Sequence, residues 1–217
     1  MLKLAMFKRL RYGLLAMLLF TVCAVQSQGF VRPKTRGWIF QTDLGFVSGI
    51  GKFEVEKSRE IKNETYNFQI HETMAYLFNP YVYLGGGFGF DFWGKYGGFI
   101  PVFFTLNTSL ARKVAPSLHF SGGYAFKWYA SKEPPNIEGN IIVHGGKSGI
   151  WFETGLGLNA IVGKKCVLSA KFIYKIQESR ILYNKEINQE TPTPDTFTDS
   201  FKNVVYMFLG AQFGIRF

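Results

Sequence analysis

Residues 204–217 read Val-Val-Tyr-Met-Phe-Leu-Gly-Ala-Gln-Phe-Gly-Ile-Arg-Phe, and every second side chain from Val205 to Phe217 is apolar. The intervening positions begin with apolar and aromatic residues and become small or polar from Gly210 to Arg216. Side chains of a β-strand alternate between two faces, so this segment predicts a strand with one wholly apolar face. Strands of a membrane barrel need this pattern, because one face meets lipid and the other meets a polar lumen.

Seven further segments repeat the alternation. They cover residues 37–49, 66–78, 81–93, 99–110, 116–128, 150–162 and 166–178. Short connections alternate with long or polar ones, which we place at about 51–65, 129–149 and 183–203, with a shorter one at 94–98. This order predicts an all-β fold, an eight-stranded antiparallel up-and-down transmembrane β-barrel that occupies residues 37–217.

The segment 66–78 departs from the pattern at one position. Glu72 shares the apolar parity of Met74, Tyr76 and Phe78. A carboxylate that faces lipid is unfavourable. We therefore expect a β-bulge near residues 71–73 that turns Glu72 toward the interior.

The chain begins with the features of a secretory signal peptide. Residues 1–11 carry four basic side chains, and Tyr12 to Val25 is apolar apart from Thr21. This apolar stretch is shorter than the roughly 20 residues that a membrane-spanning helix needs. We predict a cleaved signal peptide at 1–27, and a periplasmic N-terminal segment at 28–36.

The charge and composition narrow the class of protein. Removing the four basic residues of the leader lowers the formal charge from +10 to +6, and the remaining excess is scattered along the chain, which argues against nucleic-acid binding. A soluble barrel or sandwich would also alternate. However, the apolar parity here is large and aromatic, with 23 Phe in the chain, while the opposite parity is rich in Gly, Ser, Thr and Asn. Those small residues suit a narrow eight-stranded lumen better than a soluble core.

Two stretches carry a resemblance to a known class. The last strand, which ends at Phe217, is similar to the C-terminal signal that barrel-insertion machinery recognises, and Tyr76 to Phe90 resembles the second hairpin of small OmpA/OmpX-like barrels. The whole pattern resembles the porin-like, PorT-type barrels of Bacteroidota. The resemblance implies an integral protein of the cell outer membrane, in contact with outer-membrane lipid and the insertion machinery. A surface or periplasmic protein partner stays open.

An even strand count with short periplasmic turns places both termini on the periplasmic side. The interior parity then collects charged side chains that we expect to form a lumenal salt-bridge network. Its members are Asp43, His71, Asp91, Glu153, Lys171 and Lys175. If Val162 faces Cys166 across a turn, Glu153 lies opposite Lys175, and a cross-strand pair of opposite charge is favourable. We expect this network to fill the lumen.

A catalytic interpretation uses other residues of the interior. His119 and Ser121 lie on one face of a strand, and Glu133 or Glu153 could orient the imidazole, as in lipid A deacylase barrels. Gly122 stands where that family has Asn, and three strands follow the motif where few should remain, so we expect no enzyme.

No group of residues has metal-ligand spacing, and we expect no cofactor. The leading hypothesis is a non-enzymatic porin-like barrel with a structural or binding role. Loop-mediated binding of a partner or ligand, and passage of small solutes, are the alternatives.

Overall fold

The computed structural model describes most of the chain from residue 36 onward. The described ranges are 36–56, 59–94, 97–110, 114–129, 136–138, 141–144, 147–162, 166–186 and 197–217. The predicted signal peptide, and the predicted periplasmic segment except Arg36, lie outside these ranges. Within them, no helix is long and apolar enough to cross a membrane.

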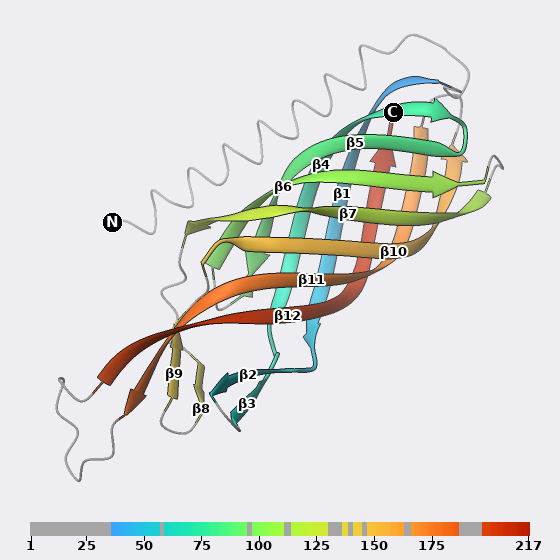
Figure 1. The fold of residues 1–217 in the computed structure, drawn as a ribbon. Coiled ribbons are helices and arrows are strands. Elements are labelled where there is room, and N and C mark those ends of the chain that lie inside the picture. Colours follow the sequence, from blue (N-terminus) through green and yellow to red (C-terminus); the bar gives the residue numbers. More distant parts are fainter. Residues whose placement is uncertain are drawn as a thin grey trace, which may run out of the picture.

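Eight long strands form a closed antiparallel barrel (Figure 1). They are β1 (Gly37–Ile50), β4 (Tyr66–Asn79), β5 (Val82–Trp93), β6 (Gly97–Ser109), β7 (Val114–Tyr129), β10 (Gly149–Val162), β11 (Cys166–Glu186) and β12 (Phe197–Arg216). Each strand pairs with its sequence neighbour in the barrel, and β1 pairs with β12 to close the ring. The predicted eight-stranded fold is confirmed, and each predicted segment falls on one of these strands.

The two ends of the barrel differ. Only two to four residues connect β4 to β5, β6 to β7 and β10 to β11, at the end that we call the short-turn end. In the first of these turns the Asn79 side chain accepts hydrogen bonds from the amides of Tyr81 and Val82, at 2.9 and 3.0 Å. An Asn side chain that bonds the backbone two residues ahead is a common device of tight turns.

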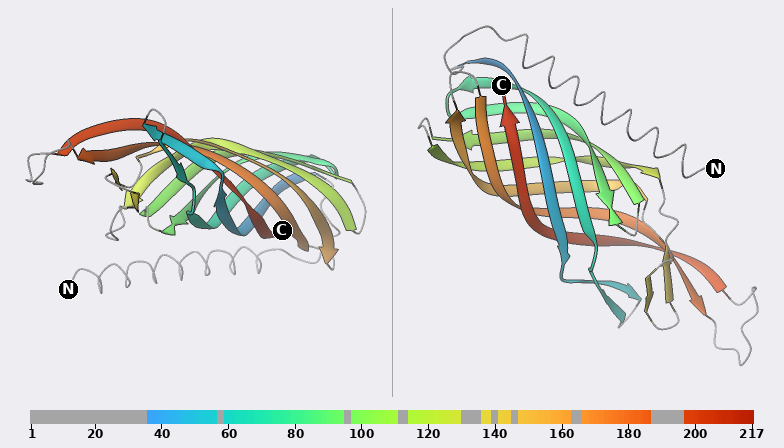
Figure 2. Two further views of the ribbon diagram at one scale, coloured as in Figure 1. Left: turned by 90° about the horizontal axis from the view of Figure 1, so that it is seen from below. Right: turned by 180° about the vertical axis from the view of Figure 1, so that it is seen from behind.

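The opposite, long-loop end carries additional strands. These are β2 (Lys52–Glu56), β3 (Arg59–Lys62), β8 (Asn136–Glu138) and β9 (Ile141–His144). Figure 1 shows them gathered at this end of the barrel, and both views of Figure 2 show β11 and β12 continuing beyond it. The predicted loop at 183–203 is therefore too long, because β11 and β12 stay paired as far as Glu186 and Phe197. The predicted loops at 51–65 and 129–149 likewise contain paired strands.

The side chains of the barrel strands alternate between two faces. We call the outward set the outer belt; its large apolar members include Phe104, which is 78% exposed, and Leu156 and Phe213, which are 65% and 64% exposed. Aromatic residues lie at both borders of the belt, with Trp38 against Tyr76 near the short-turn end. The inward set is buried and contains most of the polar side chains of the barrel.

The predicted bulge near residues 71–73 is wrong. The β4–β1 and β4–β5 registers are continuous through Glu72, and the irregularity in β4 falls between Leu77 and Asn79. His71 points inward to Asp91. This contact sets the parity of the strand, so Glu72 must point outward.

Glycines let the wall of the barrel close tightly on the inside. A Cβ atom at inward-facing Gly87 would overlap the Glu72 carbonyl oxygen and lie 2.6 Å from Cζ of Phe103. The next residue, Gly86, faces outward, and the nearest atom to its Cβ would be the Phe103 carbonyl oxygen at 3.4 Å. The two neighbours therefore differ in the space available to a methyl group.

We expect Gly87→Ala to lower the free energy of unfolding by about 1–3 kcal/mol, because the added methyl overpacks the interior. Gly86→Ala is the matched control and should change it by less than about 0.5 kcal/mol, as for an ordinary surface change. Urea unfolding in detergent micelles, followed by tryptophan fluorescence, measures both. Equal losses in the two variants would contradict this account of the interior.

Candidate functional site

The interior of the barrel is the part of the molecule with chemically active side chains. Five charged members of the predicted network are at most 3% exposed there, and so is His71. Those members are Asp43, Asp91, Glu153, Lys171 and Lys175. A charge held away from water must be paired or hydrogen-bonded to be tolerated. The contacts of these side chains therefore define the site.

Asp91 is the centre of the first group of contacts. Its Oδ1 lies 2.9 Å from Nε2 of His71, on the neighbouring strand β4, and its Oδ2 accepts a hydrogen bond from Nζ of Lys175. Lys175 belongs to β11, which is four strands away from β5 in either direction around the ring of eight. The ion pair therefore crosses the interior from wall to wall.

Aromatic rings surround this ion pair. Nζ of Lys175 lies 5.0 Å from the ring centroid of Trp151, within the range of a cation–π contact. The His71 ring lies 5.2 Å from that of Phe103 and 5.9 Å from that of Trp151. These rings exclude water from the pair and hold its partners in one arrangement.

Asp43 organises a second group nearer the short-turn end. Nζ of Lys171 lies 2.9 Å from Asp43 Oδ1, and Gln41 donates from Nε2 to both carboxylate oxygens at 3.0 and 2.8 Å. The Tyr83 hydroxyl donates to Oε1 of Gln41 at 2.8 Å, and the guanidinium of Arg216 lies 5.3 Å from the Tyr83 ring centroid. The carboxylate thus has a counter-ion and an oriented amide, as a buried charge requires.

His119 joins a third group. Its Nε2 lies 3.3 Å from Oε1 of Glu153 and 3.0 Å from Oγ of Ser121. Ser121 donates onward to Oγ1 of Thr105 at 2.8 Å. All four residues are at most 5% exposed.

This third group lacks the geometry of a catalytic triad. In a triad, the nucleophile and the acid contact different ring nitrogens, so that a proton can pass through the imidazole. Here Ser121 and Glu153 both contact Nε2 of His119, while Nδ1 has no hydrogen-bond partner among the residues that the structure describes. Glu133, the other acid proposed from the sequence, lies outside the described residues.

An aromatic cluster closes the interior toward the long-loop end. The cluster consists of Trp93, Phe99, Phe103, Trp151, Tyr206 and Phe208. Trp93 lies at its middle, with ring centroids 4.8 Å from Phe99, 4.9 Å from Phe208 and 5.2 Å from Tyr206. Phe53 of β2 packs on Tyr206 at 4.9 Å, so the β2–β3 hairpin adds to the closure.

Sequence reasoning did not identify this cluster as a plug. The signal was present, because these residues share the parity of the polar interior positions in their strands, as Trp93 does with Asp91. The sequence reasoning placed Tyr206 and Phe208 on the parity opposite the apolar face, but it gave their rings no role. Only the fold shows that rings from β5, β6, β10 and β12 meet in one place.

One predicted ion pair is replaced by another. The predicted register is present, with Val162 opposite Cys166 and Glu153 opposite Lys175. Lys175, however, reaches across the interior to Asp91, and Glu153 contacts His119 instead. Asp43 and Lys171, both members of the predicted network, form an ion pair.

Comparison with known proteins finds solved structures that are similar to this chain. The outer membrane protein OprG from Pseudomonas aeruginosa aligns with a TM-score of 0.50 and 11% identity, over 86% of this chain and 98% of that one. Neisserial surface protein A aligns with a TM-score of 0.47 and 14% identity, over 83% and 96% of the two chains. No family model and no curated protein matches the sequence. At these identities the likeness to OprG shows the fold alone.

We expect Lys175→Met to lower the free energy of unfolding by about 3–5 kcal/mol, because it leaves the buried Asp91 carboxylate without its counter-ion. Adding Asp91→Asn to the same chain should restore most of the loss, since no unpaired charge then remains. Lys62→Met is the control; its pair with Glu64 is 70% and 63% exposed, and its removal should cost less than about 1 kcal/mol. Urea unfolding in micelles compares the four proteins. A double variant less stable than Lys175→Met would show that the pair does not act as a unit.

Proposed function

We propose that this protein is an integral barrel of the bacterial outer membrane whose filled interior makes it a structural or binding protein rather than an open pore. The single observation that carries the proposal is the reversal of polarity, with an apolar, aromatic outer belt around a charged and buried interior. Water cannot solvate such a belt without aggregation, whereas lipid can. The closed ring also leaves no strand edge that would face hydrocarbon.

The dimensions and borders of the outer belt fit a bilayer. Trp38, Tyr76 and Tyr81 lie near its short-turn border, and Tyr66 and Trp128 near its long-loop border. Tyr and Trp are enriched where membrane barrels meet the two interfaces. Nine residues of a tilted strand lie between Tyr66 and Tyr76, within the roughly 9–11 that a transmembrane strand needs.

The orientation is part of the proposal. Short turns on the periplasmic side would place both termini in the periplasm, with Phe217 available to the insertion machinery. The resemblance to OmpA/OmpX-like or PorT-type barrels stays a prediction from the sequence. We also propose that the chain is not an enzyme, because His119 cannot relay a proton between Ser121 and Glu153 through a single nitrogen.

The extended β11–β12 ribbon supports binding as a second candidate function. These strands remain paired from Val167 with Arg216 to Glu186 with Phe197, and so continue past the barrel wall. Figure 2 shows the ribbon projecting from the long-loop end. A paired ribbon presents a more rigid surface to a partner than a loop does. To examine this role, the chain that lacks residues 181–202 and the full chain would be compared for binding to ligands extracted from cell surfaces.

We expect the purified barrel to give no large, stable conductance in planar lipid bilayers, because ion pairs and the aromatic cluster fill the interior. Trp93→Ala removes the ring at the middle of the cluster and should increase the frequency of brief openings. Phe104→Ala on the outer belt is the control and should leave the recordings unchanged. A large and persistent channel in the wild-type protein would overturn the closed-interior proposal.

A further inference from the structure

Glu72 is an exception on the outer belt. Among the outward side chains that the structure describes in the barrel strands, the other charged ones are Glu178 and Arg180, near the long-loop end of β11. Glu72 instead lies well inside the belt, four residues from Tyr76 and six from Tyr66, which is about 14 and 20 Å along the strand. An ionisable group at such a depth indicates a functional site.

The contacts of Glu72 satisfy it only in part. Both carboxyl oxygens accept from a single donor, the Thr42 hydroxyl, at 2.9 and 3.0 Å. The other cross-strand neighbour of Glu72 is Phe88, and the other neighbour of Thr42 is Ile215. The carboxyl group is half-buried, and the rest of its surface points away from the barrel.

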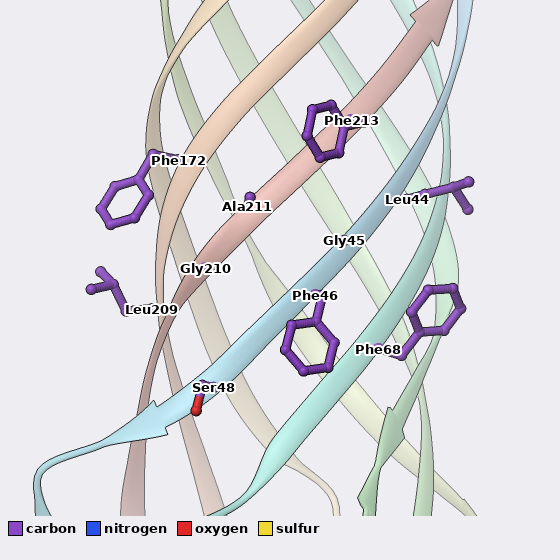
Figure 3. Close-up of a pocket in the computed structure, with 10 residues that line it drawn as sticks. All are labelled: Leu44, Gly45, Phe46, Ser48, Phe68, Phe172, Leu209, Gly210, Ala211 and Phe213. Carbon is purple, nitrogen blue, oxygen red and sulfur yellow. The ribbon is translucent and has the colours of Figure 1, made fainter.

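A groove lies beside this pair on the outer face. It has a volume of about 450 Å³, and Figure 3 shows its lining, with Ala211 between Phe46 and Phe172. The registers explain the shape, because Ala211 is the cross-strand partner of both Phe rings and is much smaller than either. Leu44 forms the end of the groove toward the short-turn side, and Thr42 is the next outward residue on β1.

We propose that the face formed by β12, β1 and β4 is a contact surface between two copies of this chain within the membrane, with Glu72 and Thr42 as its polar centre. This inference rests on the proposed membrane location. A symmetric contact must be self-complementary, and this face carries both a ridge, Phe46 with Phe68, and the groove at Ala211. Enclosure between two copies would shield the carboxyl group from hydrocarbon, and a protonated Glu72 carboxyl group, which donates as well as accepts, would meet the Glu72 carboxyl group of the second copy.

The depth of Glu72 favours a second copy over a lipid molecule. A lipid chain could occupy the groove, but it has no hydrogen-bond donor at that depth, because head groups lie level with the aromatic borders. Two copies inserted in the same orientation share one depth for every residue. The Thr42 hydroxyl and the Glu72 carboxyl of the second copy therefore lie level with those of the first, and such groups hold membrane segments together.

The test measures dimerisation of the full chain in lipid bilayers by single-molecule photobleaching. The wild type should form dimers, and Glu72→Leu should weaken dimerisation roughly tenfold, because the polar contact is lost. Glu72→Gln keeps a hydrogen-bonding group and should dimerise nearly as well as the wild type. Ala211→Phe fills the groove and should abolish dimers, whereas Ala160→Phe, the same change on β10 of the belt, should not.

Heat-modifiable migration on gels reports whether each variant has a folded barrel. A folded wild-type barrel that stays monomeric in bilayers would overturn the contact surface while leaving the proposed membrane location intact. Dimers that persist in both folded Glu72→Leu and folded Ala211→Phe would also overturn it. A wild-type chain that remained soluble without detergent would overturn both proposals. If Ala211→Phe does not fold, the comparison of Glu72→Leu with Glu72→Gln still decides the question.

Discussion

Pairing between the first and the last barrel strand is the constraint on which the rest of the structure depends. The backbone groups of Phe40 and Phe217 exchange hydrogen bonds at 3.2 and 2.9 Å, and the β1–β12 register continues from there to Ile50. Closing a sheet of only eight strands leaves room inside for little more than side chains. Inward positions must therefore be small, or must hold large side chains that fit together across the axis. Glycines such as Gly87 and the interlocked aromatic cluster are these two solutions.

The small width of the eight-stranded barrel also explains why its interior can hold charged side chains. Asp91 and Lys175 stand on opposite walls, yet their side chains meet, because the interior is about as wide as the two together. Two buried charges gain from each other only when geometry and further hydrogen bonds are good, and His71 and Trp151 supply those contacts here. The Asp91–Lys175 and Asp43–Lys171 ion pairs connect strands that are not neighbours in the sheet. They therefore add contacts across the barrel that the backbone hydrogen bonds between adjacent strands do not provide.

The alternation of apolar with small or polar side chains allowed the fold to be predicted from the sequence. This pattern is local, because it relates each residue only to the residues two positions away. Pairing between adjacent strands was also within reach, as the facing of Glu153 and Lys175 shows. Contacts across the interior were not, since they depend on the tilt and stagger of the strands. Lys175 therefore binds Asp91, and a neighbour-based argument assigned it to Glu153. The plug of aromatic rings was missed for the same reason, because its members come from four strands.

At Glu72 the alternation of the strand conflicts with the apolar character of the outer belt, because it points a carboxyl group outward. The parity of β4 at Glu72 is fixed by the inward contact of His71 and by registers with both neighbouring strands that are continuous through this residue. The fold could relieve the carboxyl group by a bulge, but it keeps the register and gives the group Thr42 as a partner. Departures from a pattern that the rest of a sequence obeys tend to mark function rather than error. An apolar groove lies beside Glu72, so a polar centre and a complementary shape lie on one face of the barrel. Both features are what a contact with a second copy requires.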